Sequence, residues 1–405
     1  MRCRQSLLLV FSLLFCQPAW AQVAPESAEK YNDGQALFEK RRYQQALQAF
    51  EDAVKLDGNN AQAYRGMAKT YQKLKDSEKA IANFRMATTV KADYVEAHYE
   101  LGNLFYNLKR YKDAQAAFKA VLNLDGNFQN GNARNLLKAA YSRQGREHLL
   151  RKNYRKAIEE YENATQLDPT DATNYYNLGL AARNARKIKQ AETAFATAVE
   201  LNPTYAKAHR QLGDLFRLTK RSSRAIRSYS RAIDSDPNNK DKKNINAYRS
   251  LALVYNQTKQ HSKAVATLRK GVAVAPTNRD KVRIYTALGY SHALGKNYRS
   301  AVSAYQQALA LNSRDSEAQY RAAVAYFELK QYQNALNYAR RAARDRSRYG
   351  VPAYVIMGDV YDAWRPQGWK EKAIQNYSRG LRDRKFKKYC EDKIDRIKNP
   401  VDTGE

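Results

Sequence analysis

Apolar residues recur three and four positions apart through most of the chain. Ala80, Phe84 and Ala87 follow this spacing, and so do Ala114 and Phe118. Residues at this spacing share one face of an α-helix, so the pattern predicts a series of amphipathic helices. Glycine (17) and proline (9) are sparse for 405 residues. This sparseness argues against a turn-rich β protein and favours an ordered, largely helical chain.

The helical pattern returns at a fixed interval of 34 residues. The stretch that begins at Ala63 and Tyr64 is repeated at Ala97 and His98, with the same order of small and large apolar positions. A hairpin of two helices cannot bury its faces alone, whereas stacked copies can. Four copies end in a proline, which cannot continue the hydrogen-bond ladder of a helix. Ten copies begin near residues 27, 61, 95, 138, 172, 206, 245, 282, 316 and 351.

This repeat resembles the tetratricopeptide repeat family over nearly all of the chain. The resemblance implies an all-α fold, a right-handed α-solenoid of about ten helical hairpins over residues 22–385. After the last copy, apolar residues at helical spacing predict a capping helix over residues 386–398: Phe386, Tyr389, Cys390, Ile394 and Ile397. We expect residues 399–405 to form a disordered tail.

Extra residues interrupt the 34-residue interval at three places. Gln129–Leu137, Lys240–Asn244 and Arg279–Lys281 fall between copies, and we interpret them as loops or slight bends. The last copy has an enlarged turn between its two helices, flanked by Trp364 and Trp369. These two tryptophans are a possible loop contact for a partner.

The first 21 residues have the layout of a cleavable secretory signal. Arg2 and Arg4 precede an apolar stretch, and Ala19 and Ala21 give a small-residue cleavage pattern. A lipidated Cys16 is the competing interpretation. The sequence therefore predicts an exported chain, periplasmic or extracellular, from a bacterial source. No later stretch approaches the length of about 18 apolar residues that a membrane span needs, so we expect no transmembrane segment in the mature chain.

The sequence contains no recognisable signature of catalysis. The five histidines occupy three slots of the repeat that hold aromatic or other core residues in other copies, which predicts a packing role for each: His98, His148, His209, His261 and His292. No glycine-rich phosphate loop, nucleophile elbow or paired-cysteine motif is present in the sequence. We therefore expect no enzyme activity, cofactor or metal.

The chain is strongly basic, and the charge is unevenly spread. The formal net charge is +31, of which +23 lies in residues 206–405 and only +6 in residues 22–205. A field of this size attracts polyanions and anionic surfaces.

The resemblance also implies a binding face. In this family, ligands commonly lie along a concave groove lined by positions 2, 5, 9 and 12 of the first helix of each hairpin. Those positions here hold arginines interleaved with aromatic residues, which suits an extended acidic segment, because guanidinium groups pair carboxylates and rings offer apolar surface. The candidate groove residues are Arg65, Lys69, Tyr99, Asn103, Tyr106, Arg146, Tyr176, Arg183, Lys207, Arg210, Arg217, Arg249, Arg283, Tyr290, Tyr320 and Phe327.

Two functional hypotheses follow. The first is a protein-interaction scaffold of the cell envelope that holds an acidic, extended partner segment in the groove. The second is direct binding of anionic polysaccharide or lipid headgroups by the basic C-terminal half. Nucleic acid also suits the charge, but the export signal argues against it.

Overall fold

The computed structural model describes residues 23–345 and 348–399, and all regular secondary structure in these ranges is α-helical. The predicted signal segment 1–21 and all of the predicted tail except Asn399 lie outside the described residues. The described chain divides into two compact units, one ending at Ala185 and the other beginning at Arg186. This division falls inside the fifth copy of the repeat.

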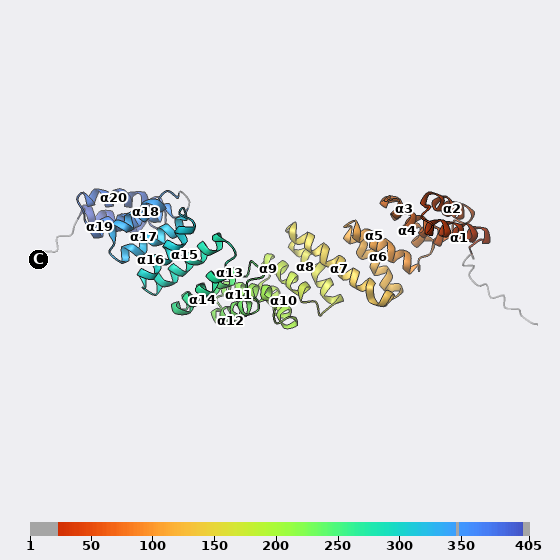
Figure 1. Cartoon of the computed structure of the whole chain (residues 1–405), viewed down its shortest axis with the longest axis horizontal. Helices are drawn as coiled ribbons and strands as arrows, with labels where there is room; N and C mark the ends of the chain where they lie inside the picture. The colour runs from red at the N-terminus through yellow and green to blue at the C-terminus, as the bar shows by residue number, and fades with distance from the viewer. Residues whose placement is uncertain (1–22, 346–347, 400–405) are drawn as a thin grey trace, which may run out of the picture. The chain divides into compact units, whose positions relative to one another are not determined.

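Helices in the first unit follow one another with short turns (Figure 1). They are α1 (Pro25–Glu39), α2 (Tyr43–Leu56), α3 (Ala61–Lys73), α4 (Ser77–Val90), α5 (Val95–Asn107), α6 (Tyr111–Leu124), α7 (Phe128–Leu150), α8 (Tyr154–Leu167) and α9 (Ala172–Asn184).

Helices in the second unit follow the same plan. They are α10 (Ile188–Leu201), α11 (Ala206–Leu218), α12 (Ser222–Asp234), α13 (Ile245–Gln257), α14 (His261–Ala273), α15 (Asn278–Leu294), α16 (Tyr298–Leu311), α17 (Ser316–Glu328), α18 (Tyr332–Ala342), α19 (Gly350–Trp364), α20 (Trp369–Gly380) and α21 (Lys387–Lys398).

Helical hairpins stack in sequence order inside each unit. In the second unit α11 packs on α12, α12 on α13, α13 on α14, and so on to α20 and α21. The first helices of neighbouring hairpins also contact one another: α13 contacts α15, and α15 contacts α17. The predicted solenoid of helical hairpins with a C-terminal helix is confirmed.

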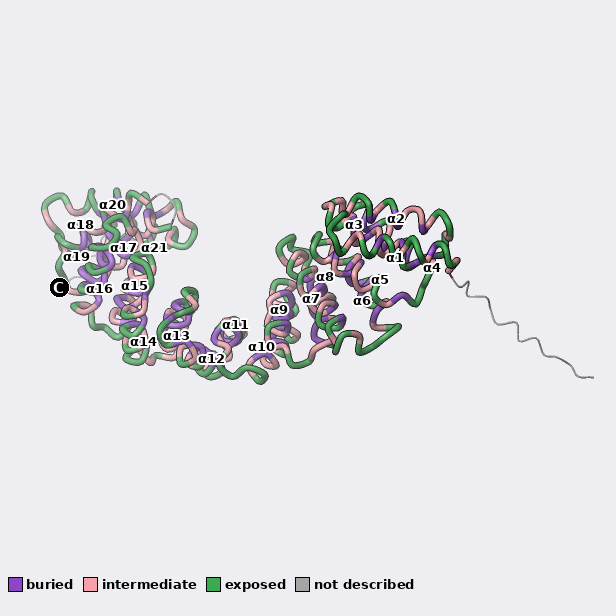
Figure 2. Tube along the Cα trace, turned by 45° about the vertical axis from the view of Figure 1, so that its right-hand side comes forward, coloured by how far each residue is buried: buried purple, intermediate pink, exposed green. Residues whose placement is uncertain are grey.

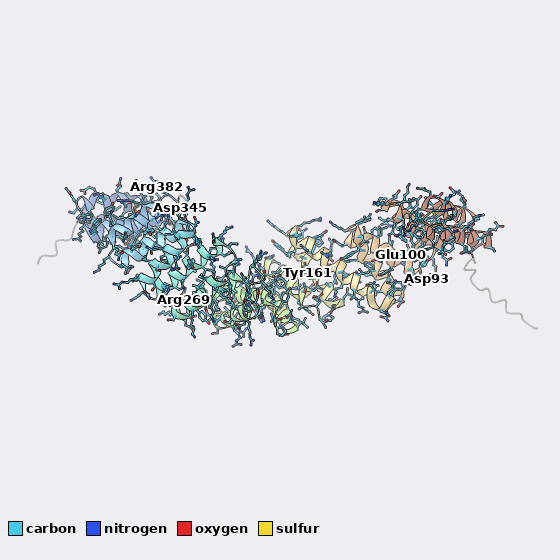
Figure 3. The ribbon with its side chains drawn as sticks, in the orientation of Figure 1. Asp93, Glu100, Tyr161, Arg269, Asp345 and Arg382 are labelled. Carbon is cyan, nitrogen blue, oxygen red and sulfur yellow. The ribbon has the colours of Figure 1, made fainter. Side chains whose placement is uncertain are left out.

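The core of several hairpins depends on a glycine that faces an aromatic ring. Gly289 of α15 lies so close to Tyr305 of α16 that an added Cβ would stand 2.5 Å from the ring. The ring of Tyr161, labelled in Figure 3, would stand 3.1 Å from a Cβ at Gly145. Such contacts let the two backbones approach closely, and the buried positions in Figure 2 lie along the packed faces of the helices.

Two inserted segments turned out to be helical. α7 begins at Phe128, ten residues before the predicted start of its copy, and Gln129, Asn130 and Gly131 take positive φ values inside it. α15 begins at Asn278, so Arg279–Lys281 form its first turn. Residues 129–131 form a kink in α7, as the interpretation of a slight bend predicts, whereas the rest of that segment and Arg279–Lys281 are helical and not loops. Lys240–Asn244 does form a loop, as predicted.

The last helix is tied to α19 by charged and hydroxyl groups. Asp362 accepts hydrogen bonds from Lys393 at 3.1 Å and from Arg396 at 2.5 Å. Asp359 accepts from the hydroxyls of Tyr377 and Tyr389. The predicted capping helix is thus present as α21, one residue shorter than expected at its start.

Candidate partner-binding site

The first unit uses several of its predicted groove residues within its own fold. The Arg65 guanidinium forms a two-point ion pair with Glu100, a residue labelled in Figure 3, at 2.6 and 2.7 Å. Burial acts to lower the pKa of Arg65, but Glu100 outweighs it and the pKa is raised. The ammonium of Lys69 lies 5.5 Å from the centre of the Phe38 ring. Arg65 and Lys69 line one small pocket of about 40 Å³.

Other groove candidates of the first unit lie apart from this pocket. The Tyr99 hydroxyl accepts a hydrogen bond from the Asn132 side chain at 2.6 Å. Tyr106 packs edge-on against Tyr111, with ring centres 5.6 Å apart. The remaining candidates here are half-buried except for the exposed Arg146: Asn103, Arg146, Tyr176 and Arg183.

Two groove arginines of the second unit are held by neighbouring groups. The Arg210 side chain is only 12% exposed, pairs with Asp241 at 3.9 Å and donates to the Lys243 carbonyl at 3.2 Å. Arg217 donates to the Tyr229 hydroxyl at 3.4 Å. Both arginines therefore fix local structure, whereas Lys207 is exposed on α11.

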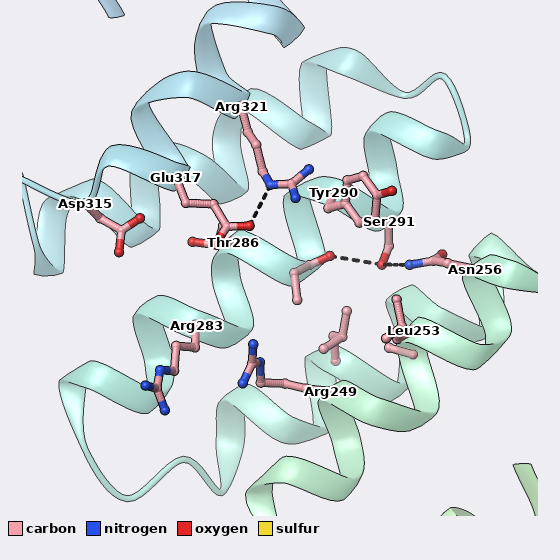
Figure 4. A pocket seen from close by; sticks show the side chains of 13 residues that line it. Arg249, Leu253, Asn256, Arg283, Thr286, Tyr290, Ser291, Asp315, Glu317 and Arg321 are labelled. Carbon is pink, nitrogen blue, oxygen red and sulfur yellow. Dashed lines mark hydrogen bonds and ion pairs between the residues drawn. The ribbon is translucent and has the colours of Figure 1, made fainter. Parts of the chain in front are cut away.

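A pocket in the second unit brings together three predicted residues: Arg249, Arg283 and Tyr290 (Figure 4). Its volume is about 210 Å³, and its walls come from α13, α15 and α17, the first helices of three successive hairpins. Positions 2, 5 and 9 of the repeat thus do converge on one hollow here.

Two further hollows share lining residues with this pocket. One, of about 270 Å³, shares Tyr290 and Arg321 and is also lined by the predicted Tyr320. The other, of about 390 Å³, shares Arg283 and Asp315. The linings of the three hollows include both Asn278 and Leu294, the first and last residues of α15. We call these three adjoining hollows together the α15 groove.

Arg249 is the most unusual group in the α15 groove. Its Nε is buried, and its side chain has no hydrogen bond or ion pair with any described residue. Burial, reinforced by the nearby Arg283 cation, holds the pKa of Arg249 below its ordinary value. Arg283 is exposed and likewise has no ion pair within 4.0 Å among the described residues. Two adjacent guanidinium groups, one of them partly desolvated, form a site for an anion.

The opposite wall of the pocket is electrostatically satisfied. Arg321 donates to Glu317 at 2.9 Å, and its guanidinium lies 4.2 Å from the centre of the Tyr290 ring. Burial acts to lower the pKa of Arg321, but the Glu317 carboxylate and other neighbours prevail and raise it. The Asp315 carboxylate caps α17 by accepting from the Ala318 amide at 2.8 Å. Both carboxylates thus have partners of their own, and the Glu317 charge only partly offsets the lowering of the Arg249 pKa.

Polar side chains close the inner end of the pocket. Asn256 donates to the Ser291 hydroxyl at 2.9 Å, and its own carbonyl oxygen lies 3.1 Å from Nδ1 of His261. The pocket thus combines an anion site, a tyrosine face and a rigid polar wall.

The lining residues that sequence reasoning missed include Asn256, Asp315, Glu317 and Arg321. Asn256 and Glu317 stand at positions 12 and 2 of the repeat, which the groove rule covers, but they are neither basic nor aromatic. Asp315 precedes its copy and Arg321 stands at position 6, so the rule could not reach them. Phe327 lies half-buried near the end of α17.

The two tryptophans flank the turn between α19 and α20, Trp364 as the last residue of α19 and Trp369 as the first residue of α20. Trp364 is 41% exposed and stacks on Tyr332, with ring centres 6.3 Å apart. Trp369 is half-buried under the Arg365 guanidinium at 5.1 Å. Neither lines the α15 groove.

Two searches of the described residues gave negative results. No group of three or more histidine, cysteine, aspartate or glutamate side chains is arranged to hold a metal ion within residues 23–345 and 348–399. Within the same ranges, every helix is too short or too polar to span a bilayer.

Family models for the tetratricopeptide repeat match the chain in several segments. They cover residues 34–75, 61–94, 95–128, 145–182, 176–240, 245–278 and 286–349. Together these segments cover more than half of the chain, and they coincide with the stacked hairpins. The chain belongs to the tetratricopeptide repeat family.

Named relatives share only part of their length with this chain. A STIP1 homolog of Dictyostelium discoideum is 28% identical over 102 residues, 25% of this chain and 18% of the relative. The co-chaperone sgt12 of Aspergillus fumigatus is 26% identical over 111 residues, 27% of this chain and 33% of the relative. The mouse protein O-mannosyl-transferase TMTC3 is 32% identical over 75 residues, 18% of this chain and 8% of the relative.

Two solved structures are similar to this chain in fold. A tetratricopeptide repeat protein from Parabacteroides merdae covers 65% of this chain and 99% of its own, with a TM-score of 0.46 and 16% identity. Yeast Tom70 covers 92% of this chain and 95% of its own, with a TM-score of 0.40 and 14% identity. Similarity at this level gives no information about the partner.

Proposed function

We propose that this protein is a non-enzymatic scaffold of the cell envelope that binds an extended, acidic segment of a partner protein in the α15 groove. Proteins of this family bind protein partners, and the two co-chaperone-type relatives are in keeping with such a role. The observation that carries the acidic preference is the half-buried Arg249, whose buried Nε has no hydrogen-bond partner, beside the exposed Arg283.

A carboxylate of the partner would complete the hydrogen bonds that Arg249 lacks. A guanidinium and a carboxylate form two parallel hydrogen bonds, which gives both energy and direction. The adjoining hollow is lined by Tyr290, Tyr298, Tyr305 and Tyr320, which would take an apolar or aromatic side chain. The preferred segment therefore has an acidic residue followed by an apolar one.

Export is part of this proposal and rests on the sequence of residues 1–21. A basic start, an apolar stretch and a small-residue cleavage site support passage into the periplasm or the extracellular space.

The test compares two arginine variants for peptide binding. Arg249→Leu removes the anion site, and Arg269→Leu removes an exposed cation of α14 that has no ion pair among the described residues. The probe is a labelled, unstructured peptide with glutamates between apolar residues, beside the same peptide with glutamines. We expect Arg249→Leu to weaken binding of the glutamate peptide by about tenfold to a hundredfold, the value of one charged hydrogen-bonded pair. Equal binding of both peptides, or equal loss in both variants, would contradict the proposal.

A stability measurement on the same variants separates function from structure. Removal of a partly buried, unpaired charge should raise the free energy of unfolding, by about 1 kcal/mol. If Arg249→Leu instead lowered it, Arg249 would have a structural role.

The alternative hypothesis is binding of anionic polysaccharide or lipid headgroups by the basic second half. It is favoured by the net charge of +23 in residues 206–405. Such binding would fall steeply with salt and accept varied anions, whereas a desolvated groove contact should survive moderate salt.

A further inference from the structure

One backbone feature recurs in the turn between the two helices of the hairpins. A single residue there adopts a left-handed conformation, with φ between 53° and 63°. In every copy this residue is a lysine or an arginine: Arg41, Lys75, Lys109, Lys152, Arg186, Lys220, Lys259, Lys296, Lys330 and Arg365. Lysine and arginine together make up 71 of 405 residues, so their presence at all ten turns is not a reflection of composition.

The left-handed conformation does not favour these side chains. A residue with a Cβ loses roughly 1–2 kcal/mol there, and glycine or asparagine is the usual occupant. The turn after α15 is an example: Gly295 takes an ordinary φ of −80°, while the adjacent Lys296 takes the left-handed value of +59°. The backbone conformation therefore does not explain why these residues are lysine or arginine. The positive charge that they share does explain it.

The turn cations are directed to solvent. All ten are exposed. In the second unit the side chains of Lys220, Lys259, Lys296 and Lys330 have no ion pair or hydrogen bond with a described residue. Their charges are thus not used to hold the hairpins together.

Exposed apolar side chains accompany these cations. In the second unit Leu218 is 65% exposed two residues before Lys220, Leu294 is 39% exposed before Lys296, and Trp364 is 41% exposed. The first unit repeats the arrangement with Leu108 at 38% and Leu150 at 73%. Exposed leucines beside lysines are an amphipathic combination.

Turn cations of the second unit lie along one edge. Consecutive helices run antiparallel because short turns join them, so the first helices α11, α13, α15, α17 and α19 run parallel. These helices contact one another in order, which places their C-terminal ends at the same side of the unit. We call this side, with Lys220, Lys259, Lys296, Lys330 and Arg365, the turn edge.

We propose that the turn edge of the second unit binds an anionic lipid surface. Each lysine near such a surface is attracted by the negative headgroups, and the leucines and Trp364 enter the boundary between headgroups and acyl chains. A soluble polysaccharide has no apolar layer to receive the leucines, so the observations favour a lipid. The inference is independent of the α15 groove, whose lining contains none of the five turn cations.

The experiment measures sedimentation of the purified protein with vesicles of phosphatidylcholine alone or mixed with phosphatidylglycerol. The turn variant carries Lys220→Asn, Lys259→Asn, Lys296→Asn and Lys330→Asn, because asparagine tolerates the left-handed conformation. The control removes the same charge from exposed cations on second helices or opposite-edge loops: Arg227→Gln, Lys270→Gln, Arg314→Gln and Arg344→Gln.

We expect the protein to bind the mixed vesicles and not the neutral ones. The turn variant should lose on the order of tenfold or more in vesicle affinity at an unchanged melting temperature, while the control loses far less. Equal losses in the two variants would show a response to net charge alone and overturn the proposal.

A second pair of measurements separates lipid from polysaccharide. Leu218→Ser with Leu294→Ser should weaken vesicle binding at high salt, where the apolar contact remains after the charges are screened. Alginate serves as the soluble anionic competitor. If the serine variant bound vesicles normally, and the turn variant lost alginate binding as strongly as vesicle binding, the ligand would be a polyanion and not a membrane. Arg249→Leu should leave vesicle binding unchanged, because Arg249 is not part of the turn edge. A failure of the lipid proposal can therefore be distinguished from a failure of the groove proposal.

Discussion

At the scale of single residues, most buried polar groups of this protein are satisfied within the fold. Arg221 holds Glu192 with two nitrogens, and Arg65 holds Glu100 in the same way. Arg249 Nε departs from this rule, as do five other buried atoms of the described residues, among them Nε of Arg210, and Arg249 is distinguished by lining the α15 groove. Burial favours the neutral form of His148, His209 and His292, because it lowers the pKa of each.

His209 gives a pH-dependent prediction. Its Nε2 lies 2.9 Å from the Pro203 carbonyl, and burial lowers its pKa, as it does for His148 and His292. The unfolded chain therefore takes up protons more readily than the fold, so the free energy of unfolding should fall as pH drops from about 7 to 5. His209→Tyr, which places the residue found at equivalent positions such as Tyr64, should flatten this fall in thermal melts. An unchanged pH slope in the variant would contradict the assignment.

At the scale of elements, α21 closes the open end of the array. Its inner face contributes Cys390, which is fully buried, and Ile397. Burial raises the pKa of the Cys390 thiol to about 11, so the thiol is neutral and shielded at ordinary pH. Outside the predicted signal segment this is the only cysteine of the sequence, which makes it a reporter of α21 docking.

Asp362→Asn should loosen this helix. The Asp362 side chain is 9% exposed and receives both Lys393 and Arg396, so neutralising it should weaken docking by about 1–3 kcal/mol. The rate of Cys390 labelling by a thiol reagent should rise about tenfold or more as α21 opens. Glu371→Gln, an exposed carboxylate of α20, is the control and should leave the rate unchanged. A labelling rate equal to that of the unsubstituted protein would mean that apolar packing alone holds α21.

At the scale of the whole molecule, each helix packs only on near neighbours in the sequence. Stability in such an array is a sum of hairpin and interface contributions, and a local defect stays local. The described chain also divides into two compact units.

Gly289→Ala tests this locality. The added methyl would stand 2.5 Å from the Tyr305 ring, so we expect a loss of about 1–3 kcal/mol from overpacking. Hydrogen exchange should quicken in α15, α16 and α17 and remain unchanged in α1–α8. Gly145→Ala in the first unit, with its looser 3.1 Å approach to Tyr161, is the milder counterpart. Uniform loss of protection across both units would show that they unfold as one.

Much of the fold could be predicted because the repeat carries its own register. The first helices begin at residues 61, 95, 172, 206, 245 and 316, where the 34-residue frame places them. The frame also predicted that Arg249, Arg283 and Tyr290 share a face, since positions 2, 5 and 9 of the first helices were expected to line one groove. It could not predict that Arg210 would form an ion pair with Asp241, because Asp241 lies in an inserted segment that has no position in the repeat.

The sequence by itself determined the class of fold, the helix pairs and the candidate groove face, because periodic packing is a local property repeated at every copy. Only the tertiary structure decided which lysine and arginine side chains form ion pairs or hydrogen bonds within the fold and which do not. Contacts between residues of different hairpins determine that Arg65 is paired, that Nε of Arg249 is buried without a partner and that the turn lysines are exposed. The division at Ala185 also became visible only in three dimensions, since the repeat continues through it without a break in spacing.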